Sequence, residues 1–170
     1  LCQRLGLSAY VIAPKATLPA WREVLTSAGI EIDAIESWEK ARRTKKLEHK
    51  PGRLFLFDEV HRAKNRKTAN AKFMLKAAAK GRIHMMSATA VMDPLDMGAI
   101  GPVLGLFKPQ EYWNWCLSHG CSKGLWGGLD FEDKDDKILN DIHKSIFPAK
   151  GVRLRKDDIP GFPDCSVEVM

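Results

Sequence analysis

Cysteine is scarce in the sequence, and long apolar runs are absent. The four cysteines are spread irregularly over 170 residues, a distribution typical of reduced thiols rather than of a disulfide-stapled secreted domain. They are Cys2, Cys116, Cys121 and Cys165. No run of about eighteen apolar residues occurs, and no secretory signal opens the chain. We therefore expect an intracellular protein, cytoplasmic or nuclear, with no membrane-spanning segment.

Three potential zinc ligands, Cys116, His119 and Cys121, lie together in the segment CLSHGC. The segment lacks the paired C-x-x-C knuckles of a structural zinc site. Buried or idle thiols are the favoured interpretation, and a zinc site is the alternative.

The charge is biased toward cations. Lysine and arginine number 27 against 21 acidic residues, so the formal net charge is +6. An excess of this sign favours polyanionic partners, because cations contact phosphates and release counterions. Many basic proteins nevertheless bind no nucleic acid. The length suits one domain with a substantial core, and the start at Leu1 inside a helical pattern suggests a piece of a longer protein.

Four short apolar runs alternate with segments of helical periodicity. Three of the runs are almost continuous, which is typical of strands buried on both faces of a parallel sheet. The expected strands span residues 9–13, 30–35, 54–57 and 82–88, and the expected helices span residues 18–29, 37–49 and 68–81. Strand and helix in alternation predict an α/β doubly wound, mainly parallel sheet with helices on both faces.

The character of the chain changes after Pro94, where glycine, proline and aromatic residues become frequent. We interpret residues 1–94 as the α/β core and residues 95–150 as a helical appendage. The appendage is expected to contain a flexible loop over residues 122–137 and a helix over residues 137–147. Residues 151–170 are interpreted as a bridge leading out of the domain.

Asp58 and Glu59 directly follow the apolar run that ends at Phe57. In a doubly wound sheet, ligands bind beyond the carboxyl ends of the strands. Two carboxylates there suit magnesium–nucleotide chemistry, in which one holds Mg²⁺ through water and the other acts on an attacking water. The alternative is that the two acids only favour the start of the next helix, where negative charge is stabilising.

Several short motifs resemble those of one family when they are taken in order. DEVH at residues 58–61 and SAT at residues 87–89 resemble motifs II and III of superfamily-two helicases and translocases. VIAPKATLPAWREVL at residues 11–25 looks like motif Ia with its helix, and IESWEKAR at residues 35–42 looks like the segment that follows. DEVHRAKN is similar to the extended motif II of Swi/Snf-type DNA translocases, and VRLRKDDIPGFPD resembles the bridge between their two lobes.

The resemblance implies a RecA-like first lobe of an ATP-dependent motor that uses ATP and Mg²⁺. Asp58 would position Mg²⁺ through water, Glu59 would act on the hydrolytic water, and His61 would link the nucleotide site to motif III. The segment Ser87, Ala88 and Thr89 would couple hydrolysis to lobe movement. The partners implied are DNA, with double-stranded DNA favoured, and a second RecA-like lobe of the same protein. The residues implied to contact the DNA backbone are Pro14, Lys15, Thr17, Arg62, Lys64 and Asn65.

The sequence also departs from the family pattern. It contains no Gly-rich phosphate loop ending in Gly-Lys-Thr, and its motif III reads SATA rather than Gly-Thr-Pro. We expect this chain alone to hydrolyse ATP poorly. Two alternatives stay open: a degenerate lobe that only binds DNA or a protein, and the motor part of a restriction or recombination helicase.

Two further groups of residues have competing interpretations. Tyr112, Trp113 and Trp115 could stack on bases, but packing within the appendage is favoured. The cations at residues 42–46 could contact DNA, but a solvated helix end is favoured.

Overall fold

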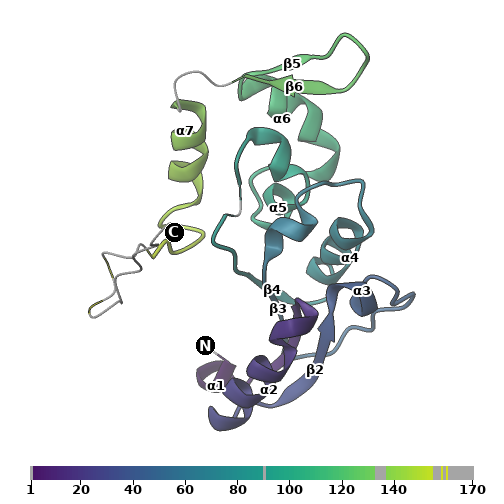
Figure 1. The fold of residues 1–170 in the computed structure, drawn as a ribbon, viewed down its shortest axis with the longest axis vertical. Helices are drawn as coiled ribbons and strands as arrows, with labels where there is room; N and C mark the ends of the chain where they lie inside the picture. Colours follow the sequence, from purple (N-terminus) through teal and green to yellow (C-terminus); the bar gives the residue numbers. More distant parts are fainter. Residues whose placement is uncertain (1, 90, 133–136, 155–157, 159, 161–170) are drawn as a thin grey trace, which may run out of the picture.

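The computed structural model describes residues 2–89, 91–132, 137–154, 158 and 160. Four strands form one sheet in the order β2-β1-β3-β4, and every pairing is parallel (Figure 1). The strands are β1 (Ser8–Ala13), β2 (Ile32–Ser37), β3 (Arg53–Phe57) and β4 (Arg82–Met85). Because β1 lies between β2 and β3, the chain reverses its direction of winding after β2, as expected for a doubly wound sheet.

Alternate residues of the central strands point to opposite faces, and each face is covered. Tyr10 and Phe57 belong to one buried cluster, whereas Val11 and Leu56 belong to another. The first cluster includes side chains of α3 (Trp38–Ala41), α4 (Ala69–Ala78), α5 (Met97–Val103) and α7 (Lys137–Ile146). The second includes side chains of α1 (Cys2–Leu5) and α2 (Leu18–Ser27). The predicted α/β class with helices on both faces is thereby confirmed.

Local sequence explains where two of these helices begin and end. The helix α4 begins after Thr68, whose side chain accepts a hydrogen bond from the backbone N–H of Ala71 at 3.2 Å. The helix α2 has Pro19 in its first turn, where the missing N–H has no partner to lose. It is followed by Gly29 at φ +61°, a left-handed conformation that glycine adopts without strain.

The helix expected over residues 37–49 was wrong, because α3 covers only its first turn. A continuous helix would stack the cations at 42, 43, 45 and 46 on neighbouring turns, where like charges repel. Instead the chain leaves the helix after Ala41. Leu47, only 6% exposed, is buried in the core, and the Lys76 ammonium donates to the backbone carbonyls of Thr44 and Lys45.

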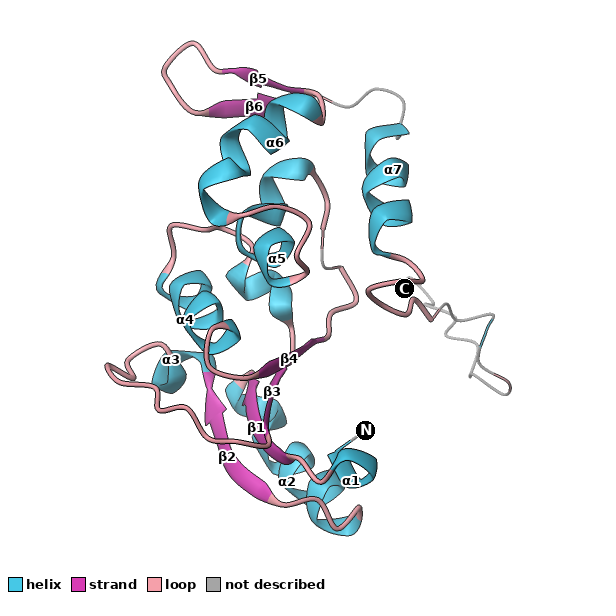
Figure 2. Ribbon diagram, turned by 180° about the vertical axis from the view of Figure 1, so that it is seen from behind, coloured by secondary structure: helices cyan, strands magenta, loops and turns pink. Residues whose placement is uncertain are grey.

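Residues 97–132 begin with α5, which packs beside α4, and extend away from the sheet, and α7 returns toward it (Figures 1 and 2). Within this segment α6 (Tyr112–Ser118) is followed by a small antiparallel hairpin of β5 (Cys121–Lys123) and β6 (Leu129–Phe131). The hairpin lies inside the segment expected to be a flexible loop. Its tip carries Leu125 and Trp126, which are 99% and 98% exposed. The segment and α7 are anchored because Met97, Ile100 and Ile142 join the same buried cluster as the sheet.

The aromatic residues of α6 mostly pack within this segment. The Trp115 ring lies 4.7 Å from the Phe107 ring and 4.0 Å from the His119 ring, between centroids. Tyr112 donates a hydrogen bond to the Leu95 carbonyl at 3.1 Å. Trp113 is 40% exposed.

The three cysteines inside the described ranges are free and buried. Burial raises the pKa of the Cys116 thiol and raises that of Cys121 to about 12, so both thiols are protonated at neutral pH. Among the described residues, no three His, Cys, Asp or Glu side chains gather as a metal cluster. Cys165 and most of the expected bridge (155–157, 159 and 161–170) lie outside the described residues. No described helix is long and apolar enough to span a bilayer.

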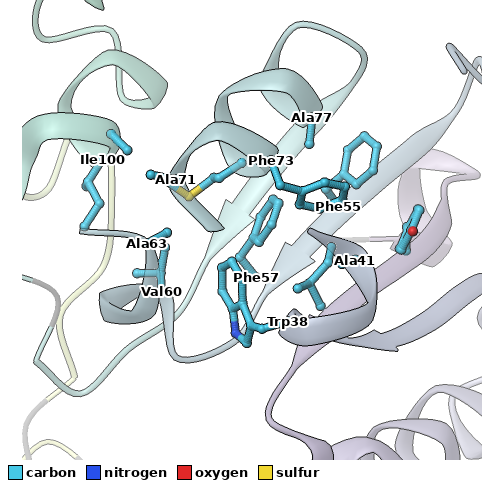
Figure 3. Close-up of a cluster of buried hydrophobic side chains, with 14 of the residues drawn as sticks. Trp38, Ala41, Phe55, Phe57, Val60, Ala63, Ala71, Phe73, Ala77 and Ile100 are labelled. Atoms are coloured by element: carbon cyan, nitrogen blue, oxygen red, sulfur yellow. The ribbon is translucent and has the colours of Figure 1, made fainter. Parts of the chain in front are cut away.

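The largest part of the core lies between the sheet and α4 (Figure 3). Trp38 is fully buried there, with its ring centroid 5.4 Å from that of Phe57. Phe57 in turn contacts Phe73 of α4 edge-on, at 6.2 Å between centroids. These rings fix the end of β3, which is the strand that leads into Asp58.

A buried ion pair joins β2 and β3 and supports a stability prediction. Arg53 Nε lies 2.6 Å from Asp33 Oδ2, and the two side chains are only 11% and 14% exposed. Burial alone would raise the pKa of Asp33, but hydrogen bonds from Lys50 and Arg53 outweigh burial and lower the pKa below its usual 3.8. A depressed carboxyl pKa adds stability above pH 4 that is lost as the pH falls through the folded-state value.

We therefore expect Asp33→Asn to lower the free energy of unfolding by about 1–3 kcal/mol at pH 7, because Arg53 loses its charged partner. Urea unfolding at pH 7 and at pH 3 checks this, and the difference from wild type should shrink at pH 3. Glu48→Gln is the control, because the Glu48 side chain is 74% exposed and pairs with Lys46 in solvent. An equal loss at both pH values would contradict the assignment to the ion pair.

Candidate functional site

Four loops meet at the carboxyl edge of the sheet. Pro14–Thr17 follows β1, the segment from Ser37 follows β2, Asp58–His61 follows β3 and the segment from Ser87 follows β4. The edge comes together because the four strands run parallel, so that their carboxyl ends lie on the same side of the sheet. The motif residues predicted from sequence are thus brought to one side of the molecule.

Asp58 is held by donors on both carboxylate oxygens. The backbone N–H of Glu59 donates to Oδ1 at 3.0 Å, and the indole Nε1–H of Trp21 donates to Oδ2 at 3.0 Å. The backbone is fixed as well, because Asp58 N donates to Ile12 O at 2.9 Å and Trp38 Nε1 donates to Asp58 O at 3.0 Å. Each carboxylate oxygen retains a second lone pair. An oriented carboxylate of this kind fits a Mg²⁺ ion that keeps most of its water.

Glu59 has a left-handed backbone, with φ 52° and ψ 52°. It is the only non-glycine residue with positive φ in the described part of the chain. This conformation is unfavourable for a residue with a side chain and is often found at functional sites. The turn starts η2 (Val60–Ala63) and leaves the Glu59 side chain 41% exposed, beside the half-buried Asp58.

His61 joins the loop after β3 to the loop after β4. Its Nδ1 lies 3.1 Å from Glu59 Oε2 and 3.2 Å from Ser87 Oγ. Ser87 Oγ also accepts a hydrogen bond from the Thr89 backbone N–H at 3.3 Å. A neutral imidazole with its proton on Nδ1 can donate to either oxygen, so a change at Glu59 can be passed to Ser87 by reorienting one hydrogen bond.

A cationic hollow of about 560 Å³ opens at the same edge, lined by segments at the carboxyl ends of β1, β2 and β3. Its lining contains four cations and one acid, which is a strongly positive balance. The lining residues are Lys15, Ser37, Glu39, Lys40, Arg43 and Arg62. Glu39 stays ionised, because a hydrogen bond from its own backbone N–H and one from Ser37 lower its pKa. It lies 3.5 Å from Arg62 Nη1, and Lys40 Nζ lies 2.9 Å from Glu36 Oε1. Lys15 and Arg43 are therefore the lining cations with no ion pair among the described residues, and they are left to face an anionic ligand.

A smaller hollow of about 220 Å³ lies between the loop after α3 and the helix α4. It too is lined by cations, among them Arg42, Lys72 and Lys76. Positive charge therefore continues from the edge of the sheet along the side of the domain.

The residues predicted to contact DNA fall into two groups. Lys15 and Arg62 meet in the cationic hollow. Lys64 and Asn65 instead have partners inside the domain: Lys64 Nζ lies 3.1 Å from Asp96 Oδ1, and Asn65 Oδ1 accepts from the Lys67 backbone N–H at 3.0 Å. Thr17 donates its hydroxyl to the Pro14 carbonyl at 3.0 Å and so stabilises the turn that presents Lys15.

Four residues of the site escaped prediction from sequence. Trp21 was not predicted to belong to the site. It is half-buried, packs against the second cluster and donates a hydrogen bond to Asp58 across 37 positions. Lys40 was given no role from the sequence, and Arg43 was expected at a solvated helix end, with DNA contact as the alternative; both line the hollow. Asp96 is only 7% exposed, pairs with Lys64 and accepts from the Met92 backbone N–H at 3.1 Å. The available signal for Asp96 was its sequence, DPLD, which is a typical helix start.

Comparison with known proteins gives one structural likeness. No family model and no curated protein matches the chain. Among solved structures, the SWI2/SNF2 ATPase core of Sulfolobus solfataricus in complex with dsDNA is similar at a TM-score of 0.48 and 19% sequence identity. The match covers 70% of this chain and 30% of that chain, so this chain spans less than a third of the archaeal protein's length.

Proposed function

We propose that the chain is the first RecA-like lobe of an ATP-dependent DNA translocase or helicase, of Swi/Snf-like type, that works with a second lobe. The observation that carries the proposal is the juxtaposition of an oriented carboxylate with a cationic hollow at one sheet edge. The order of the motif-like segments supports it, because DEVH and SAT end neighbouring strands. A motor needs both elements, one for the nucleotide and one for the track.

The roles of the residues follow from their positions. Mg²⁺, when bound with ATP, would supply positive charge that offsets the negative charge developing on the phosphates. Asp58 would hold that ion through water, because both of its oxygens are already oriented. Glu59 would accept a proton from the attacking water, since its exposed carboxylate stands next to Asp58. His61 would report the state of Glu59 to Ser87 through the contacts at 3.1 and 3.2 Å.

The cationic hollow would hold phosphates of the DNA backbone. Lys15 and Arg43 provide positive charge without reading base edges, which is the kind of contact that positions a protein on DNA irrespective of sequence. Such contacts suit a motor that steps along any sequence. Double-stranded DNA is the proposed track on the resemblance of DEVHRAKN to the Swi/Snf-type motif II.

The experiment that tests this function is ATP hydrolysis by the intact protein, with and without duplex DNA. We expect turnover to rise with duplex DNA. Salt-sensitive DNA binding without any turnover would instead support a degenerate lobe that only binds DNA. Absence of both would overturn the proposal.

Removing cations from the hollow is expected to weaken DNA binding and reduce its salt dependence. In Lys15→Ala/Arg43→Ala, the slope of log affinity against log salt should fall by about 2, because each phosphate contact contributes about one unit. Fluorescence anisotropy with a labelled duplex over a salt series measures this. Lys123→Ala is the matched control, since Lys123 is exposed on the hairpin strand β5. An unchanged slope in the double variant would exclude the hollow as the DNA contact.

A further inference from the structure

The segments that line the cationic hollow are all joined to Asp58. The 3-10 turn η1 (Lys15–Thr17) lines it and leads directly into α2, which carries Trp21. The helix α3 lines it and carries Trp38. The turn η2 lines it through Arg62 and follows Asp58 along the chain. A ligand that displaces any of these three segments is therefore expected to change the position of Asp58.

The two indoles hold different parts of Asp58. Trp38 is fully buried and donates to the backbone carbonyl, so it fixes the end of β3 as part of the core. Trp21 is half-buried and donates to the side-chain oxygen Oδ2. The opposite oxygen, Oδ1, is held by the backbone of the β3 loop. The orientation of the carboxylate plane thus depends on where α2 stands relative to β3.

The position of α2 is also tied to the hollow. Trp21 lies six residues after Lys15, about one and a half helical turns from the start of the segment. The turn between them is rigid, because Thr17 bonds the Pro14 carbonyl through both its backbone N–H and its hydroxyl, each at 3.0 Å. A displacement of Lys15 is therefore expected to displace the Trp21 indole as well.

From these contacts we infer that Trp21 is a positioning residue that couples a polyanion bound in the hollow to the carboxylate of Asp58. The inference rests on the proposed function, because it takes Asp58 as the group that holds the nucleotide's Mg²⁺. DNA in the hollow sets the position of α2, and the Trp21 N–H sets the orientation of Asp58. Misplacement of a catalytic group by about 1 Å can reduce rates by about 10²-fold. Through the hydrogen bond from Trp21 to Asp58, bound DNA would thus control the geometry of the nucleotide site.

The test uses Trp21→Phe in the intact protein, which removes the N–H and keeps an aromatic ring. Anisotropy measures affinity for a labelled duplex with and without Mg²⁺ and a non-hydrolysable ATP analogue. In wild type the analogue should change duplex affinity, and the duplex should change analogue affinity by the same factor, as linkage requires. In Trp21→Phe we expect this factor to fall about three- to tenfold toward one, which is the scale of one ordinary intramolecular hydrogen bond. Duplex affinity without nucleotide should stay within about twofold.

Turnover gives a second readout of the same coupling. Trp21→Phe should raise the Mg²⁺ concentration for half-maximal turnover and lower the stimulation by duplex DNA. Trp21→Leu also removes the donor and should lose the coupling equally, so a deficit found only in Leu would indicate packing. Trp113→Phe is the matched control, because Trp113 is 40% exposed in α6 and carries no bond to Asp58.

The outcomes separate the inference from the function on which it rests. Wild-type coupling retained in both Trp21 variants would overturn the inference and leave the motor function standing. If wild type shows no turnover, the motor function fails, and the binding linkage alone decides the inference. No linkage in wild type would overturn the inference as well.

Discussion

Replacing Glu59 by glutamine in the intact protein should lower DNA-stimulated ATP turnover by about 10²–10⁴-fold, the usual contribution of a general base. The amide keeps the size of the side chain but cannot accept a proton from water. It also removes the negative charge 3.1 Å from His61 Nδ1. Binding of duplex DNA should change by less than about threefold, because Glu59 does not line the cationic hollow.

Turnover of Glu59→Gln is measured beside that of Glu132→Gln, in which the same chemical change is made far along the chain, just after β6. Turnover of the control should match wild type. If Glu59→Gln hydrolyses ATP at the wild-type rate, Glu59 does not transfer the proton. Its role would then be only structural, at the start of η2. A variant that loses both turnover and DNA binding would indicate a folding defect instead.

Replacing Trp38 by alanine is expected to have the largest effect on stability, about 3–5 kcal/mol in the free energy of unfolding. The side chain is fully buried against Phe57 (Figure 3), so its removal leaves a cavity under the end of β3. The change also deletes the donor to the Asp58 carbonyl. Chemical denaturation of the 170-residue chain measures the loss, and Trp38→Phe should lose less because it refills most of the space.

The chain supplies its own control for this experiment. Trp126→Ala makes the identical substitution at a residue that is 98% exposed, so its free energy of unfolding should change by less than about 0.5 kcal/mol. Similar losses at both positions would show that Trp38 does not have the buried environment described here.

The sheet and the place of Asp58 could be predicted because they depend on local sequence. The run Leu54–Phe57 is apolar at every position, which is typical of a strand buried on both faces. A polar residue that ends such a strand must lie at the carboxyl edge. The same reasoning places Ser87 beside it, because β4 pairs with β3 in register.

The partners of Asp58 could not be predicted, because they depend on how helices rotate against the sheet. Trp21 reaches Asp58 only because Leu25, 3% exposed, fixes which side of α2 is buried. The periodicity of α2 predicts which face of the helix is buried, but it does not predict which atoms of the sheet that face contacts. The pairing of Lys64 with Asp96 likewise crosses 32 positions and joins the end of η2 to a short 3-10 turn, η3 (Pro94–Asp96).

The short strands and the extent of α3 were not predicted correctly, for different reasons. Strands of three residues such as β5 and β6 contain too few alternations to be distinguished from a loop. The failed helix after Ala41 shows tertiary contacts overriding local pattern, since burial of Leu47 and the contacts of Lys76 favour the irregular path.

The left-handed backbone at Glu59 has a consequence for how this position can evolve. Glycine would adopt φ 52° without a steric penalty, whereas a residue with a side chain gives up about 1–2 kcal/mol there. Selection for thermal stability alone would therefore favour glycine at this position. Glycine would also delete the carboxylate that His61 contacts. A lineage that keeps glutamate here accepts a less stable fold in exchange for its chemistry, and one released from that chemistry is free to drift toward glycine.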